Sequence, residues 1–172
     1  IMCVSKGLTG GYLPLSLVIT TNEIYNAFYD DYEKLKSFLH SHSYSGNPLA
    51  CSVAIETLNI FKEENTLDKL KHKSKYLKNS VENLFKDLDY VGEIRSMGMI
   101  CAIELVKDKK SKEPFDFKDR IGYKIYKIAL ENSLILRPLG NVLYFMPPYI
   151  ITNQQIDEMI NIALFSYKKF FK

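Results

Sequence analysis

The sequence has no tryptophan and only three cysteines, Cys3, Cys51 and Cys101. No two of them form a CxxC pair, and none stands at a metal-ligand spacing from a histidine. Neither a zinc site nor a dithiol redox motif is therefore indicated. Their odd number and scattered positions are typical of small, buried thiols, and we expect a reducing compartment.

Long apolar runs and a strong net charge are also missing. No apolar stretch is long enough to cross a bilayer, and no charged stretch followed by an apolar one opens the sequence. The net charge of +3 is small and the lysines are spread out, so neither nucleic acid nor an anionic membrane is indicated as a partner. We expect a cytoplasmic protein. Because Ile1 lies inside an apolar run, we also expect the chain to be a piece of a longer one.

The first third of the sequence predicts strands and then helices. Residues 2–20 contain two β-prone runs on either side of a glycine-rich turn that carries Lys6. Residues 22–39 predict a weakly patterned helix. Asn47 as N-cap and Pro48 at the first helical position predict another helix, which is apolar almost all round and is therefore expected to be buried.

The remainder predicts a mixed fold. Leucines and Val81 recur at three, four or seven residues between 67 and 88, which predicts one amphipathic surface helix. The further expected elements are strands over 91–106 with a break at Gly98, a polar loop over 109–116, a helix over 117–131, two apolar runs within 134–146, and a last helix opened by the capping box of Thr152 and Gln155. This order predicts α/β architecture at the start and α+β after about residue 60.

Lys6 stands where a β-prone run ends and Gly7, Gly10 and Gly11 follow. It fits a surface lysine whose stem packs on apolar groups while its ammonium reaches water. A P-loop lysine is excluded, because the glycines follow the lysine and GxxxxGK[ST] does not occur. A Schiff-base lysine, kept nucleophilic by desolvation and neighbouring charge, also fits. The turn alone does not choose between the surface lysine and the Schiff-base lysine.

Longer motifs resemble a known family. These are SKGLTGGYLPLS around Lys6, HSHSYSGNPLA before residue 51, and ILRPLGNVLYFMPPYIIT over 135–152. Together, and in this order, they resemble the class III (fold type I) pyridoxal-phosphate aminotransferases. The resemblance implies an α/β fold, with residues 1–55 as the tail of the large cofactor-binding domain and residues 56–172 as the small C-terminal domain.

The resemblance also implies residue roles. Lys6 would carry pyridoxal 5'-phosphate and act as the catalytic base and acid, and Ser43 would bind the cofactor phosphate, usually from the neighbouring subunit of a homodimer. Ser41 would lie near the keto substrate. Arg137 would fork two hydrogen bonds onto its carboxylate, and Tyr144 would line the same pocket. The alternatives are ordinary loop polarity for the serines and a surface ion pair for the arginine.

Within the family, the motifs are most similar to those of the biotin-pathway branch. Its members use S-adenosylmethionine as amino donor and 8-amino-7-oxononanoate as acceptor, and they give 7,8-diaminononanoate. The family's phosphate loop, ring-stacking tyrosine and ring-nitrogen aspartate have no counterpart here, which again suggests a C-terminal portion that is inactive alone. Another class III aminotransferase, with an ω-amino acid or ornithine-type donor, and a non-catalytic fragment stay open. His40 and His42 alone do not indicate a metal.

Overall fold

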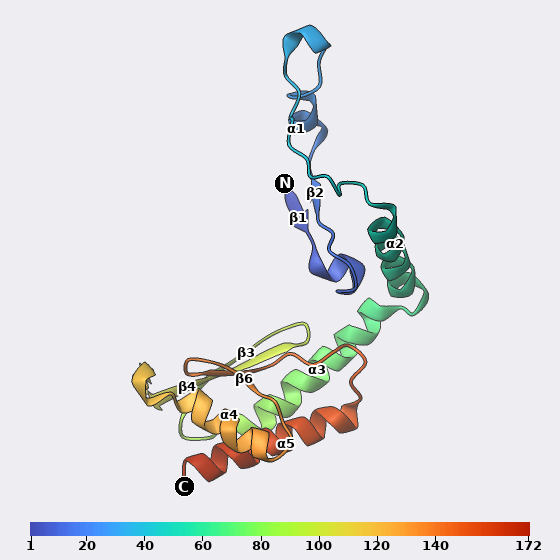
Figure 1. Cartoon of the computed structure of the whole chain (residues 1–172). Coiled ribbons are helices and arrows are strands. Elements are labelled where there is room, and N and C mark those ends of the chain that lie inside the picture. The colour runs from blue at the N-terminus through green and yellow to red at the C-terminus, as the bar shows by residue number, and fades with distance from the viewer. The chain divides into compact units, whose positions relative to one another are not determined.

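The computed structural model describes all residues from Ile1 to Lys172. The chain folds as two compact units, Ile1–Thr66 (unit 1) and Leu67–Lys172 (unit 2), which Figure 1 colours from blue to green and from green to red. The domain boundary at residue 55 that the resemblance implies stays a prediction.

Unit 1 opens with the two predicted strands. β1 (Met2–Val4) and β2 (Leu17–Ile19) pair in antiparallel fashion, with Met2 opposite Ile19. Between them the chain forms the 3₁₀ turn η1 (Lys6–Thr9). The prediction of strands on either side of a turn that carries Lys6 is therefore confirmed.

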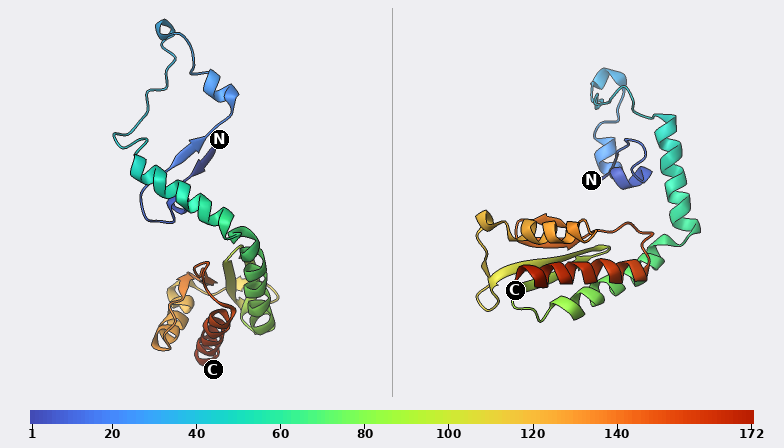
Figure 2. Two further views of the ribbon diagram at one scale, coloured as in Figure 1. Left: turned by 90° about the vertical axis from the view of Figure 1, so that its right-hand side faces the viewer. Right: turned by 60° about the horizontal axis from the view of Figure 1, so that its bottom comes forward.

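The helix predicted over 22–39 is largely wrong. Only α1 (Asn22–Asn26) and the 3₁₀ turn η2 (Tyr32–Lys34) form there, and the chain between α1 and the next helix is mostly an open loop (Figure 2). The side chain of Asp30 accepts a hydrogen bond from the Asp31 N–H at 2.9 Å, a local bond that competes with helix formation.

The next helix, α2 (Pro48–Glu63), begins as predicted. The Asn47 side chain accepts a hydrogen bond from the Leu49 N–H at 3.0 Å, and Pro48 occupies the first turn. The expectation that α2 is buried is wrong, since only Ala50 and Ala54 are buried and Leu49 is 71% exposed. Unit 1 contains too few residues to cover an apolar helix on all sides.

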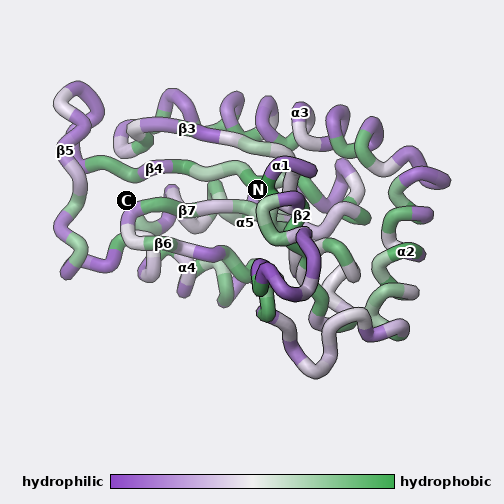
Figure 3. The backbone as a smooth tube through the Cα atoms, turned by 90° about the horizontal axis from the view of Figure 1, so that it is seen from above, coloured by the Kyte–Doolittle hydropathy of each residue, from purple (hydrophilic) through white to green (hydrophobic).

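Unit 2 is a sheet with helices on one face (Figures 1 and 3). The strand order is β3-β4-β7-β6, all antiparallel, with the short β5 added to β4. Its elements are α3 (Thr66–Phe85), β3 (Val91–Met97), β4 (Ile100–Asp108), β5 (Glu113–Pro114), η3 (Phe117–Asp119), α4 (Ile121–Glu131), β6 (Arg137–Leu139), β7 (Val142–Phe145) and α5 (Asn153–Phe170). These match the predicted order, except that β5 interrupts the expected polar loop.

The core of unit 2 lies between the sheet and its helices. Alternate residues of β4, Cys101, Ile103 and Leu105, are fully buried and face α3 and α5, which contribute apolar positions one turn apart. The capping box of α5 is present, because the Thr152 and Gln155 side chains each bond the other's backbone N–H. No helix of either unit combines the length and the apolar character needed to cross a membrane.

Candidate functional site

Lys6 begins η1 in a backbone conformation that is unusual for a lysine. Its φ is 41°, in the left-handed region, which residues with a Cβ adopt at a cost. A position of this kind is kept only where the surroundings enforce it, and such positions gather at functional sites. Sequence reasoning missed this strain, because it assigned the whole turn to the neighbouring glycines.

Backbone hydrogen bonds enforce the turn. The Gly11 N–H donates to the Lys6 carbonyl and the Gly10 N–H donates to the Gly7 carbonyl, each at 3.1 Å. Gly10 and Gly11 have φ values of 60° and 84°, so both use the left-handed region that glycine tolerates. The two glycines therefore fold the chain back immediately after the lysine.

A side chain missed by the sequence reasoning also holds the turn. Thr9 is only 1% exposed, and its hydroxyl donates to the Leu13 carbonyl at 2.6 Å. The sequence feature that could have indicated Thr9 is its position, as a polar residue between Leu8 and the glycines of a tight turn.

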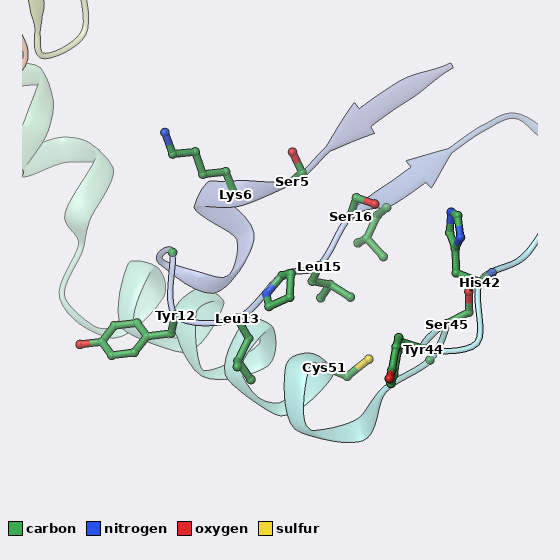
Figure 4. Close-up of a pocket in the computed structure, with 14 residues that line it drawn as sticks. Ser5, Lys6, Tyr12, Leu13, Leu15, Ser16, His42, Tyr44, Ser45 and Cys51 are labelled. Atoms are coloured by element: carbon green, nitrogen blue, oxygen red, sulfur yellow. Dashed lines mark hydrogen bonds between the residues drawn. The ribbon is translucent and has the colours of Figure 1, made fainter.

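A cavity of about 790 Å³ opens beside η1. It is lined from the Lys6 segment (Ser5, Lys6, Gly11 to Leu17), from the loop before α2 (His42, Tyr44, Ser45, Gly46) and from Cys51 at the start of α2. Figure 4 shows the Lys6 side chain on the opposite side of the cavity from His42 and Ser45, extending away from them. The structure thus brings two of the three family-like motifs to one cavity.

The two predicted loop serines lie near this cavity but do not line it. Ser43 starts the turn over 43–46, and Ser41 precedes that turn. The serine hydroxyl that this loop contributes to the lining is that of Ser45, which accepts a hydrogen bond from the His42 N–H at 3.1 Å. Ser45 is therefore a lining residue that the sequence reasoning passed over.

The electrostatics of the cavity suit an amine that must react. Lys6 takes part in no ion pair, and no aspartate or glutamate lines the cavity. A Cβ built on Gly7 would meet nothing within 4 Å, which leaves room beside the lysine. A free primary amine, serine hydroxyls and open space fit an aldehyde-bearing phosphate such as pyridoxal phosphate. A carboxylate for its ring nitrogen is not among the lining residues.

Arg137 and Tyr144 meet in unit 2. They are directly opposite each other in the β6–β7 pair, and both line a second cavity of about 470 Å³. Its other walls are mostly apolar and come mainly from the segments 134–136 and 145–151, with Gln155 and Met159 added from α5. Arg137 is exposed and forms no ion pair, so the alternative of a surface ion pair is not what the structure contains.

The arrangement around Arg137 can bind a carboxylate. A guanidinium presents parallel donors to a carboxylate, and a phenol beside it can donate a further hydrogen bond. The apolar wall suits an aliphatic chain attached to that carboxylate. His40, by contrast, lies tilted against the Phe38 ring and meets His42 edge to face, and no group of three His, Cys, Asp or Glu side chains is placed to hold a metal.

The family model "Aminotransferase class-III" matches residues 1–164. The chain is 44% identical over 168 residues to the adenosylmethionine-8-amino-7-oxononanoate aminotransferase of Aquifex aeolicus, a match that covers 98% of this chain and 37% of that protein. It is 38% identical over 164 residues to the putrescine–pyruvate aminotransferase of Pseudomonas aeruginosa, covering 95% of this chain and 35% of that protein.

A solved structure is similar over the same range. The adenosylmethionine-8-amino-7-oxononanoate aminotransferase of Methanocaldococcus jannaschii superposes with a TM-score of 0.90 at 41% identity, over 97% of this chain and 38% of that one. The chain therefore spans little more than a third of the length of these relatives.

Proposed function

Since the chain belongs to the class III aminotransferase family, we propose that it is the C-terminal part of a transaminase of biotin biosynthesis. The parent protein would transfer an amino group from S-adenosylmethionine to 8-amino-7-oxononanoate and give 7,8-diaminononanoate. The match to relatives of that name over nearly the whole chain supports the choice of substrates. The observation that carries the enzymatic interpretation is Lys6, an unpaired amine at a strained turn beside an open cavity.

Pyridoxal 5'-phosphate, when bound, supplies an electron sink that stabilises negative charge on the substrate carbon bearing the amino group. Lys6 would hold the cofactor through its side-chain amine. When free, the same amine would take a proton from the substrate carbon as a base and give a proton back as an acid. Lys6 takes part in no ion pair, which leaves its amine free to meet the cofactor.

The remaining residues bind and orient. Ser43 provides a hydroxyl and a backbone N–H to the cofactor phosphate, and Ser41 lies on the keto-substrate side of the same loop. Arg137 binds the carboxylate of 8-amino-7-oxononanoate, with Tyr144 beside it. The apolar wall next to these two residues excludes water from around the substrate's aliphatic chain.

The proposal extends to the domains and subunits of the full-length protein. Residues 1–55 form the tail of the large cofactor domain, and residues 56–172 form the small domain. The full-length enzyme is a cytoplasmic homodimer in which Ser43 serves the partner's cofactor. No carboxylate that could pair with the ring nitrogen lines the Lys6 cavity.

A second candidate is a class III transaminase that uses another donor, such as a diamine or an ω-amino acid. The relative named for putrescine and pyruvate, at 38% identity, favours it. The test is to supply the full-length protein with either S-adenosylmethionine and 8-amino-7-oxononanoate or putrescine and pyruvate, and to identify the products by mass. Turnover of only the first pair, with 7,8-diaminononanoate as the product, supports the proposal. Turnover of only the second pair replaces it with the second candidate.

A further inference from the structure

The Lys6 turn rests on the only buried side chains of unit 1. Thr9 is 1% exposed, Ala50 is 2% and Ala54 is 7%, and no other residue of Ile1–Thr66 is buried. The turn η1 packs against α2, and the small alanines let the turn approach the helix closely. Unit 1 thus concentrates its burial at the place where the lysine-bearing turn meets a rigid element.

The Thr9 hydroxyl lies between the carbonyl of Lys6, where the turn begins, and that of Leu13, beyond the turn. Thr9 Oγ1 donates to the Leu13 carbonyl at 2.6 Å and lies 3.5 Å from the Lys6 carbonyl. A hydroxyl has one hydrogen, so the short contact to Leu13 is the hydrogen bond, and no other donor reaches that carbonyl. Thr9, the last residue of η1, therefore ties the end of the turn to the segment that leaves it.

This tie bears on the strain at Lys6. A residue with φ of 41° relaxes towards ordinary φ unless its surroundings prevent it. Rotation about this bond would swing the Cα–Cβ bond and move the amine at the end of the side chain. The Gly11 bond to the Lys6 carbonyl holds one end of the turn, and the Thr9 bond to Leu13 holds the other.

We infer that Thr9 is a positioning residue, whose buried hydroxyl fixes the Lys6 turn so that the amine is aimed at the cofactor aldehyde. The inference rests on the proposed function, because it requires Lys6 to be the cofactor lysine. In the step concerned, the amine adds to the aldehyde carbon, a C=N bond forms, and the aldehyde oxygen leaves as water. Thr9 touches neither reactant and acts only through the backbone.

The experiment uses the full-length parent protein, prepared without cofactor. Thr9→Val keeps the shape and removes the hydroxyl, and Thr9→Ser keeps the hydroxyl. Thr57→Val is the matched control, because Thr57 adjoins Gly10 of the same turn but its hydroxyl bonds to Val53 within α2, at 2.9 Å. Two quantities are measured: the rate at which the visible absorbance of the Lys–cofactor link appears with pyridoxal phosphate, and the affinity for pyridoxine 5'-phosphate, an alcohol that cannot condense.

A positioning role predicts different effects on the two quantities. In Thr9→Val the rate of link formation falls about five- to tenfold, the effect of losing one neutral hydrogen bond. Affinity for the alcohol stays within about twofold of wild type, since it needs no aimed amine. Thr9→Ser restores the rate, and Thr57→Val leaves both quantities at the wild-type level.

Two results would overturn the inference while leaving the proposed function intact. One is a rate in Thr9→Val equal to that in Thr57→Val, and the other is a parallel loss of rate and alcohol affinity, which would mean that Thr9 only maintains the cavity. If Thr9→Val does not fold, Thr9→Ala and Thr9→Ser are compared, and equal rates in that pair overturn it too. Borohydride reduction and peptide mass locate the linked lysine, and a link elsewhere than Lys6 overturns the proposed site as well.

Discussion

Replacing Arg137 tests the substrate side of the proposal. In the full-length protein, Arg137→Ala removes the guanidinium that is proposed to bind the carboxylate of 8-amino-7-oxononanoate. Arg137 is exposed on β6 and forms no ion pair, so its removal leaves no buried charge without a partner. We expect the free energy of unfolding to change by less than about 0.5 kcal/mol, as for most surface substitutions.

The loss in substrate binding is larger. Hydrogen bonds to charged groups contribute about 1.5–3 kcal/mol, which corresponds to about ten- to 150-fold in affinity for the keto acid. The exposure of Arg137 places the expected value in the lower part of that range, because water competes for the carboxylate. Arg137→Lys should recover only part of the loss, since an ammonium cannot present two parallel donors.

The assay is pre-steady-state kinetics of each half-reaction. The half-reaction with 8-amino-7-oxononanoate should weaken by the expected factor, and the half-reaction with the amino donor should change much less. Arg120→Ala is the matched control, because Arg120 lies over the Tyr123 ring at 4.1 Å and lines neither cavity. Equal losses in both half-reactions, or no loss in either, would refute the proposed role of Arg137.

Further predictions concern Lys6, the isolated chain and Cys101. In the full-length protein, Lys6→Ala should abolish turnover while leaving cofactor affinity partly intact, because the phosphate contacts remain; steady-state turnover near the wild-type rate would contradict this. The 172-residue chain by itself should fold in unit 2 but should not retain pyridoxal phosphate through dialysis, which visible absorbance checks. Burial raises the pKa of the Cys101 thiol from 9.0 to about 11, so the unfolded chain loses this proton first as pH rises. The free energy of unfolding of unit 2 should be unaffected by this thiol below about pH 9 and should fall by about 2–3 kcal/mol towards pH 11. In denaturant titrations, Cys101→Ala should lose that component, and an identical fall in the variant would assign it to other groups such as Tyr167, whose pKa burial raises to about 12.

Periodicity predicted unit 2 well because its elements bury one face each. The leucines and Val81 of α3 recur at helical spacing, and the capping box of α5 is a local signal that needs no tertiary context. Gly98 marked the break between β3 and β4, where the chain turns with a φ of 54°. In each case one short stretch of sequence contains the whole cause of the structure.

Unit 1 was predicted less well because its structure depends less on local sequence signals. The apolar pattern of α2 predicted burial, but the residues that would cover that helix are not within Ile1–Thr66. The run over 22–39 had helix-forming residues without one apolar face. A local hydrogen bond to the Asp30 side chain competes there with helix formation. Thr9 was missed because its role depends on where Leu13 returns, which spacing alone does not reveal.

The most direct test of the central claim is the position of the cofactor link in the full-length wild-type protein. The protein is saturated with pyridoxal phosphate, reduced with borohydride, digested, and its peptides are weighed. We predict that the added pyridoxyl mass lies on Lys6, within the sequence SKGLTGG, and on no other lysine of the chain. A stable link on a different lysine, with Lys6 unmodified, would contradict it.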